Sequence, residues 1–280
     1  MTHPYVIADV FTVTPLEGNP VAIFTAGDRI AEAAMQAIAR ELNLSETVFA
    51  LAPRDGADAR VRIFTPRAEL PFAGHPVLGS AVVLGSGRTE IALETGAGIV
   101  PVRLEPAANG ATFGRMLQPF PTIEAFDDGA ALLAALHVER SELPVSELYV
   151  NGPRNVYVAL ASEAAVAALA PDMEAIRAIG NINVSCFAFA GSRVKTRVFA
   201  PALGVPEDPA TGSAAGPLAL HLARHARIAF GEEIVISQGV EIKRPSLLYA
   251  SVHGSAERLE RIEVGGAAVV VAHGEFDIGI

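Results

Sequence analysis

The chain has 280 residues, of which 51% are hydrophobic and 19% charged, and its formal net charge is −10. This composition excludes an intrinsically disordered chain. Because acidic residues outnumber basic ones by 31 to 21 and no basic cluster occurs, we expect neither nucleic acid nor a membrane as a partner. A single cysteine excludes an internal disulfide, and the amino terminus lacks the layout of a signal peptide, so we expect a cytoplasmic protein.

The first part of the chain alternates short β-branched or aromatic runs with turn residues, which predicts strands. These runs are Tyr5–Thr12, Val21–Phe24, Thr47–Ala52 and Arg60–Thr65. Between them, Ala31–Leu42 carries its apolar residues on one stripe, which predicts an amphipathic surface helix. The next segment, Pro76–Gly85, is apolar on all sides and rich in small residues, so we expect a helix enclosed by other elements.

The rest of the chain contains a second segment of this kind, Gly212–Leu220, among many β-segments. Further strands are predicted at Ile91–Leu104, Thr112–Gln118, Ile234–Ile242, Ser246–Val252 and Glu257–Val271. We therefore expect an α+β fold made of two halves, each a rolled, barrel-like β-sheet around one central buried helix.

The chain repeats itself weakly but in order, at offsets of 133 to 143 residues. The matched segments are Asn43–Ala50 with Asn183–Ala190, Arg62–Pro66 with Arg197–Pro201, His75–Ala81 with Asp208–Ala214, and Glu90–Gly96 with Glu233–Gly239. Four matches in one order predict two similarly folded halves related by pseudo-symmetry. We expect an amino-terminal half over residues 1–125 and a carboxy-terminal half over 126–280, with the last strand able to return to the first half.

Each apolar helix follows a loop that ends in a polar residue and proline, namely His75-Pro76 and Asp208-Pro209. Proline suits the first turn of a helix, and the free amides of that turn attract anions. Two halves that face each other would place both helix starts across one cleft, where a small carboxylate substrate could bind. The alternative is that Asp208 only caps its helix and that His75 is an ordinary loop residue.

Glu46 lies just before the strand predicted at Thr47–Ala52. A carboxylate in such a place is either a structural group with a satisfied partner or a base whose pKa is raised by burial. Its counterpart in the second half is Cys186, so only one half supplies a carboxylate at this position.

Several familiar motifs fail. His221 and His225 lie one turn apart, but the glutamate of HExxH is missing, so we expect no metal. Neither GxGxxG after a strand nor GxxxxGK[ST] occurs, and we expect no cofactor. These absences favour cofactor-free proton chemistry.

Longer runs carry a family resemblance: Leu16–Pro20, Asn43–Glu46, Phe64–Pro76, Asn151–Arg154, Glu207–Gly216 and Gln238–Ile242. Together they resemble the PhzF family of phenazine-biosynthesis isomerases, whose fold is similar to that of diaminopimelate epimerase. The epimerase uses two cysteines as its acid–base pair, and a single cysteine excludes that mechanism in this chain.

The resemblance implies isomerisation of trans-2,3-dihydro-3-hydroxyanthranilate to its keto isomer by glutamate-mediated proton transfer, without a cofactor, in a homodimer. The residues that match the catalytic positions of the family are Glu46, His75 and Asp208, and those that match its substrate-binding positions are Ser45, Gly74, Gly212 and Ser213.

Two other functions stay open from the sequence. One is a related isomerase or epimerase that acts on another small amino or carboxylic acid. The other is a non-catalytic protein that binds a carboxylate metabolite.

Overall fold

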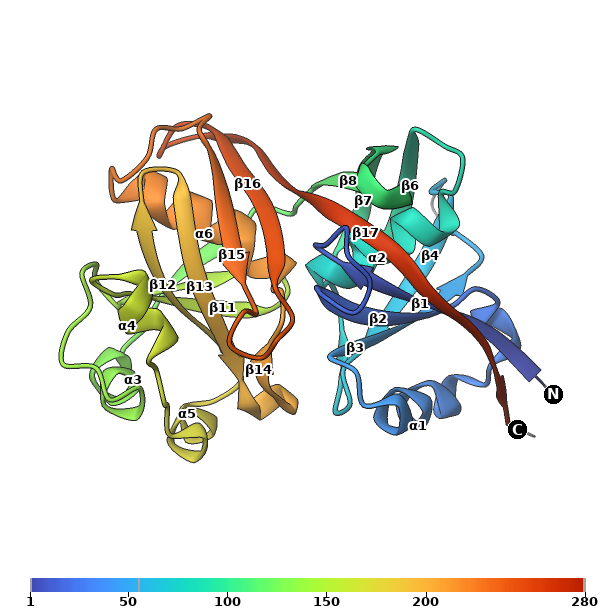
Figure 1. Cartoon of the computed structure of the whole chain (residues 1–280), viewed down its shortest axis with the longest axis horizontal. Coiled ribbons are helices and arrows are strands. Elements are labelled where there is room, and N and C mark those ends of the chain that lie inside the picture. Colours follow the sequence, from blue (N-terminus) through green and yellow to red (C-terminus); the bar gives the residue numbers. More distant parts are fainter. Residues whose placement is uncertain (1, 55, 279–280) are drawn as a thin grey trace. The chain divides into compact units, whose positions relative to one another are not determined.

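The computed structural model describes residues 2–54 and 56–278. The chain divides into two units, one made of residues 1–117 and 265–280 and the other of residues 118–264 (Figure 1). We expect the boundary at 125/126, whereas the structure divides after Leu117. The reason is strand pairing: β8 (Thr112–Leu117) pairs with a strand of the first unit, and β9 (Thr122–Ala125) pairs with a strand of the second.

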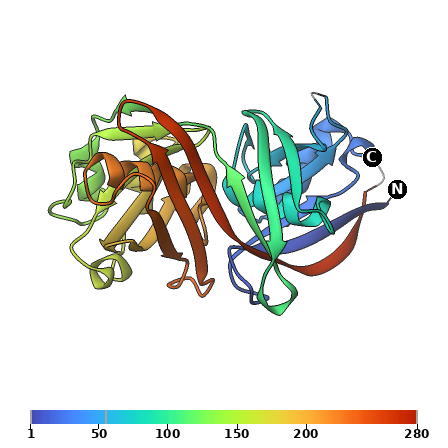
Figure 2. The same ribbon diagram turned by 90° about the horizontal axis from the view of Figure 1, so that it is seen from above.

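The first unit is a closed barrel of eight strands. They are β1 (Thr2–Val10), β2 (Asn19–Phe24), β3 (Glu46–Leu51), β4 (Ala59–Phe64), β6 (Glu90–Thr95), β7 (Gly98–Pro106), β8 and β17 (Leu259–Asp277). The pairs β2–β3 and β4–β6 are parallel, while β1 pairs with β17 antiparallel (Figure 2). A short strand, β5 (Glu69–Leu70), adds to β4, and β17 pairs with β8 to close the barrel.

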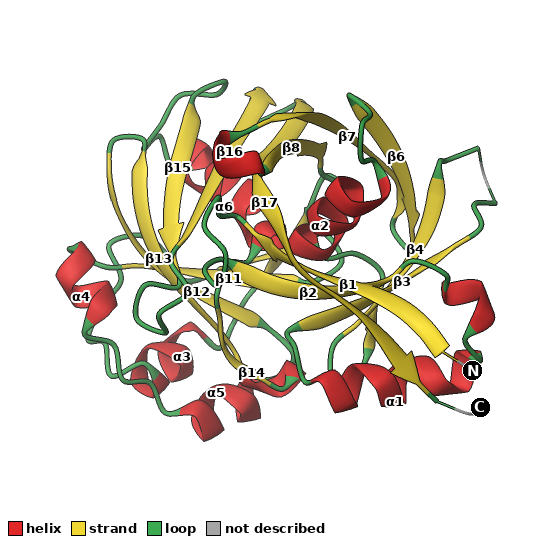
Figure 3. Cartoon of the chain, turned by 45° about the vertical axis from the view of Figure 1, so that its right-hand side comes forward, coloured by secondary structure: helices red, strands yellow, loops and turns green. Residues whose placement is uncertain are grey.

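Helix α2 (Gly74–Leu84) lies inside this barrel, against β1, β2, β3, β4, β6, β7 and β8 (Figure 3). Its residues from Gly74 to Val82 are all buried, which confirms the prediction of an enclosed helix. Small residues make the fit possible: a Cβ on Gly79 would lie 2.7 Å from Cγ1 of Val21 and 3.0 Å from Cγ2 of Val10. The outer face carries α1 (Glu32–Leu42), whose Met35 and Ile38 pack with Phe24, Phe49 and Phe64.

The second unit repeats this arrangement. Its strands are β9, β10 (Glu147–Val150), β11 (Arg154–Ala159), β12 (Asn183–Ala190), β13 (Arg193–Ala200), β14 (Val205–Asp208), β15 (Glu233–Gln238) and β16 (Ser246–Gly254). The parallel pairs β11–β12 and β13–β15 correspond to β2–β3 and β4–β6, and β14 adds to β13 as β5 adds to β4. Helix α6 (Gly212–Arg224) is buried and lies against β11, β15 and β16. The predicted duplication is therefore confirmed.

An ion pair is repeated together with the strands. In the first unit Arg62 on β4 donates twice to Glu69 on β5, at 2.7 Å each. In the second, Arg197 on β13 donates to Glu207 on β14 at 2.9 and 2.8 Å. A bidentate pair fixes both distance and orientation, so each short strand is held to its neighbour by the same contact.

Three short helices cover the second unit: α3 (Gly129–Ala135), α4 (Glu163–Ala167) and α5 (Met173–Ile179). Leu132, Val166 and Ile176 from them pack onto β10 to β12. Three 3-10 turns complete the elements, at Gly27–Arg29, Ala108–Gly110 and Pro201–Leu203. No helix within residues 2–54 and 56–278 is both long and apolar enough to cross a bilayer.

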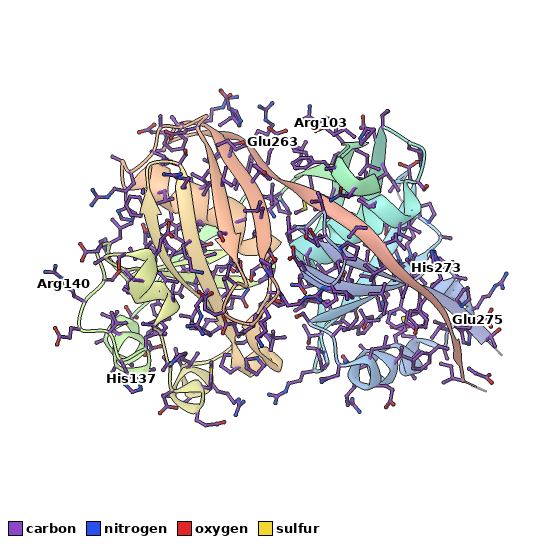
Figure 4. All side chains as sticks on the ribbon, in the orientation of Figure 1. Arg103, His137, Arg140, Glu263, His273 and Glu275 are labelled. Atoms are coloured by element: carbon purple, nitrogen blue, oxygen red, sulfur yellow. The ribbon has the colours of Figure 1, made fainter. Side chains whose placement is uncertain are left out.

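Two predicted strands differ in the structure. The single strand expected at Ile91–Leu104 is a hairpin of β6 and β7, because Gly96 and Ala97 form a tight turn after Thr95. The last strand is longer than predicted, since β17 continues to Asp277 along β1. In that continuation His273 and Glu275 are exposed and alternate with half-buried residues, as their outward side chains show (Figure 4).

The close fit of α2 predicts a coupled effect of two substitutions. Gly79→Ala should destabilise the protein by roughly 1–3 kcal/mol, because overpacking outweighs the gain in helix propensity. Val21→Ala removes the nearer methyl group, so Gly79→Ala should cost less in that background. Denaturant unfolding of the two single variants and the double variant measures this coupling. Strictly additive free energies would contradict the packing described for Gly79.

Candidate active site

Glu46 is the first residue of β3. Helix α1 ends when Asn43 takes a left-handed conformation, with φ of 51°, and its N–H bonds to the carbonyl oxygen of Ala39. The chain then passes through half-buried Ser45 into β3, where Glu46 pairs with Val21. The Glu46 side chain is 13% exposed.

His75 lies in the first turn of α2, right after Gly74, and is 3% exposed. Its Nε2 is 3.3 Å from Oε2 of Glu46, and its Nδ1 is 3.2 Å from Nδ2 of Asn19, the first residue of β2. With the amide nitrogen of Asn19 as donor, Nδ1 accepts, and the ring carries its hydrogen on Nε2, the nitrogen nearer Glu46. Asn19 belongs to the Leu16–Pro20 run of the sequence, but its contact with His75 was not predicted.

Burial governs the charge of this imidazole. Removal from water penalises the protonated ring and lowers the pKa of His75 to about 3. His75 is therefore neutral near neutral pH. The pair that the first unit presents is a carboxylate beside a neutral imidazole N–H, which is an arrangement suited to moving protons.

Asp208 is the last residue of β14 and is 8% exposed. The expectation that Asp208-Pro209 opens a helix is wrong, because α6 begins only at Gly212 and Thr211 takes the N-cap position. Asp208 is accordingly no helix cap. Its Oδ2 accepts a hydrogen bond of 2.6 Å from the Thr211 hydroxyl.

Gly212 and Ser213 form the first turn of α6, where the leading amides have no partner inside the helix. The carbonyl oxygen of Ser213 also lacks its usual partner, because the residue four positions on is Pro217, which has no N–H. Asn151 Nδ2 donates to that carbonyl at 2.9 Å, and Gln118 Nε2 donates to the carbonyl of Gly212 at 2.8 Å. The Asn151–Arg154 run thus anchors the start of α6, a role that its sequence did not reveal.

Each unit therefore brings its own predicted residues together. Glu46, His75 and Gly74 lie at the start of α2 and β3 in the first unit. Asp208, Gly212 and Ser213 lie at the start of α6 in the second. The cysteine that replaces Glu46 in the second unit, Cys186, is fully buried on β12, and burial raises the pKa of its thiol.

His221 of α6 and His225, which follows the helix, lie around a carboxylate from β10. Glu147 Oε2 lies 3.3 Å from Nδ1 of His221 and 3.0 Å from Nε2 of His225. The same carboxylate accepts from the Tyr149 hydroxyl at 2.8 Å and from Arg224 at 3.2 Å. These donors lower the pKa of Glu147. Glu147, His221 and His225 lie close enough together to hold a metal ion, and the hydrogen bonds of this cluster tie the end of α6 to β10.

A buried helix inside a rolled sheet, present twice in one chain, is the diaminopimelate-epimerase-like fold predicted from the sequence. The chain belongs to the PhzC-PhzF family of phenazine biosynthesis-like proteins, whose model matches residues 8–274.

Relatives of known name agree with this assignment. The chain is 51% identical over 274 residues to the trans-2,3-dihydro-3-hydroxyanthranilate isomerase of Pseudomonas fluorescens. The matched region covers 97% of this chain and 98% of that protein. A PhzF-family phenazine biosynthesis protein from Bacillus anthracis is similar in structure, with a TM-score of 0.84 and 27% identity over 99% of this chain and 100% of that one. A predicted epimerase from Pseudomonas aeruginosa has a TM-score of 0.82 and 32% identity, over 98% and 99% of the two chains.

The buried, neutral His75 predicts a pH-dependent part of the stability. The pKa of His75 is 6.5 in the unfolded chain and about 3 in the folded protein. Between these two pH values the unfolded state binds a proton at His75 and the folded state does not. Stability from this residue is therefore complete above about pH 6.5 and is lost as the pH falls toward 3, by up to ~1.4 kcal/mol per pH unit. His75→Gln should flatten this decline in denaturant unfolding measured between about pH 7 and pH 4.5.

The matched control is His137→Gln, because His137 is exposed (Figure 4). That variant should keep the pH dependence of the unmodified protein. Equal slopes for the His75 variant and the unmodified protein would show that His75 takes up a proton in the folded state as readily as in the unfolded one.

Proposed function

We propose that this protein isomerises trans-2,3-dihydro-3-hydroxyanthranilate to its keto isomer, with Glu46 as the acid–base residue. The observation that carries the mechanism is the contact of Glu46 with Nε2 of His75 at 3.3 Å. Asn19 binds the other ring nitrogen of His75 and so holds the imidazole in this orientation. The name and the 51% identity of the Pseudomonas fluorescens relative support the substrate.

In this proposal the carboxylate of Glu46 takes the proton from C3 of the substrate and returns a proton farther along the conjugated system. The enol that results then converts to the ketone. One base can serve both carbons when they lie on the same face of the ring. The Glu46 side chain is only 13% exposed, so little water competes with the substrate for its carboxylate.

His75 and Asp208 are proposed to bind the polar groups of the substrate and to orient its protons. His75 is suited to this as a neutral N–H donor, and Asp208 as a buried acceptor whose orientation is held by Thr211. Four residues are proposed to bind the substrate: Ser45, Gly74, Gly212 and Ser213, of which the last three are assigned to its carboxylate. The support for this assignment is the partial positive charge at the first turns of α2 and α6.

Glu46→Gln should lower kcat by roughly 10²–10⁴-fold, the usual contribution of a general acid–base residue. The loss follows because an amide cannot accept the C3 proton. Disappearance of the diene absorbance of the substrate measures turnover. Glu41→Gln, which changes an exposed glutamate at the end of α1, is the matched control and should retain full activity. Undiminished turnover by the Glu46 variant would remove this residue from the mechanism.

A second candidate is the isomerisation or epimerisation of another small amino or carboxylic acid, which the likeness to a predicted epimerase favours. Solvent deuterium separates the possibilities. Exchange into the ring of dihydro-hydroxyanthranilate supports the first proposal, and exchange only into another acid supports the second. A protein that binds such acids without any exchange would be a metabolite-binding protein.

We also propose that the protein is a cytoplasmic homodimer. Exposed strand backbone invites pairing with a second copy, and all four residues of β9 are exposed, including apolar Ile123. Light scattering coupled to gel filtration at micromolar concentration should give twice the chain mass of 29.2 kDa. A mass of one chain under these conditions would contradict the dimer.

A further inference from the structure

Three buried side chains of the second unit form a directed hydrogen-bond chain. Asp208 ends β14, Thr211 precedes α6, and Gln238 is the last residue of β15. Gln238 Nε2 lies 3.0 Å from the hydroxyl oxygen of Thr211, which in turn lies 2.6 Å from Oδ2 of Asp208. All three side chains are at most 8% exposed, so water does not compete strongly for these contacts.

The orientation of the Gln238 amide follows from its main-chain partners. The backbone N–H of Thr211 lies 3.1 Å from Oε1, and an N–H can only donate. The backbone carbonyl oxygen of Asp208 lies 2.8 Å from Nε2, and a carbonyl can only accept. A flipped amide would place donor against donor and acceptor against acceptor, so the two main-chain groups determine which end is which.

This orientation determines the direction of the next bond. Because Nε2 of Gln238 donates to the Thr211 hydroxyl, that oxygen acts as an acceptor there. Its single hydrogen is then directed to Oδ2 of Asp208, at the short distance of a hydrogen bond to a carboxylate. The chain therefore runs one way, from Gln238 through Thr211 to Asp208.

The neighbouring residue of Asp208 is held as well. Glu207 is bound by the guanidinium of Arg197 through two hydrogen bonds, which fixes β14 to β13. With the backbone held at Glu207 and the carboxylate held by Thr211, Asp208 has little freedom to change its rotamer.

The other half of the repeat lacks this arrangement. At the repeat positions of Asp208, Thr211 and Gln238 the first unit has His75, Leu78 and Thr95. Leu78 cannot form hydrogen bonds, and the Thr95 hydroxyl donates instead to the carbonyl oxygen of Gly98. The chain of hydrogen bonds therefore occurs at Asp208, and the described residues at the corresponding positions around His75 do not form it.

We propose that Thr211 and Gln238 are positioning residues for Asp208, and that they aim its carboxylate for the proton-transfer step. This inference rests on the proposed function, because the orientation of Asp208 affects turnover only if Asp208 acts on the substrate. Gln238 acts through Thr211 and through its own bond to the backbone carbonyl oxygen of Asp208, and neither residue needs to touch the substrate.

The test uses Thr211→Val, which keeps the side-chain shape without the hydroxyl, and Thr211→Ser, which keeps the hydroxyl. With trans-2,3-dihydro-3-hydroxyanthranilate as substrate, Thr211→Val should lower kcat by about 10–100-fold, the scale known for residues that orient the ligands of a metal site by hydrogen bonds. Its KM should change less than its kcat, because Thr211→Val leaves the Asp208 carboxylate in place and removes only the hydrogen bond that orients it. Thr211→Ser should restore most of kcat, and Gln238→Met should reduce it like Thr211→Val.

The same substitution in an Asp208→Asn background separates positioning from a general structural role. There Thr211→Val should cause no further loss of kcat, because its target has already been changed. An equal loss in both backgrounds, or wild-type kcat for Thr211→Val, would overturn the positioning role. If Asp208→Asn alone kept full activity, the proposed role of Asp208 would itself be wrong, and this outcome is distinct from a failure of the positioning role.

Discussion

Enclosure of a helix that has no polar face is the constraint on which the structure depends. The first nine residues of α2, Gly74 to Val82, are all buried, so the sheet must close around the helix completely. A flat sheet would leave one side of α2 in water, and the barrel from β1 to β8 with β17 removes that cost. The same burial removes His75 from water, because His75 belongs to the first turn of this helix.

The two units share a scaffold and differ at the positions to which chemistry is assigned. The parallel strand pairs and the Arg62–Glu69 and Arg197–Glu207 ion pairs recur because they hold each sheet and its short strand together. The differences are Glu46 against Cys186 and His75 against Asp208. A carboxylate and a fully buried thiol cannot do the same work, since burial keeps the thiol protonated. In the second unit, the segment at β12 therefore keeps its place in the sheet but carries no carboxylate at the position of Glu46.

Polar contacts around α6 illustrate how a helix interruption is compensated. Pro217 leaves the carbonyl oxygen of Ser213 without an intrahelical donor, and an unsatisfied buried carbonyl costs about 1–3 kcal/mol. Asn151 removes that cost, and Tyr157 donates its hydroxyl to the next carbonyl, that of Ala214, at 2.7 Å. The start of α6 is therefore held by side chains from β11 and from the loop before it. Rigid support of this kind suits a helix start that is assigned to substrate binding.

The sequence alone determined the rolled-sheet fold, the duplication and the positions of the enclosed helices. These features depend on local periodicity and on repeated order, which are visible in one dimension. The residues proposed for catalysis were also found in the sequence, through motifs rather than through geometry.

Only the tertiary structure decided which groups meet. Asn19 and His75 are 56 positions apart in sequence, and Thr211 and Gln238 are 27 apart, so no local pattern could pair them. The predicted start of α6 at Gly212 is confirmed, but the sequence did not show why Pro209 does not open the helix: the hydrogen bonds of Gln238 hold the Asp208–Thr211 loop out of it. Long-range contacts of this kind arise from strand pairing, and strand pairing is a property of the folded chain.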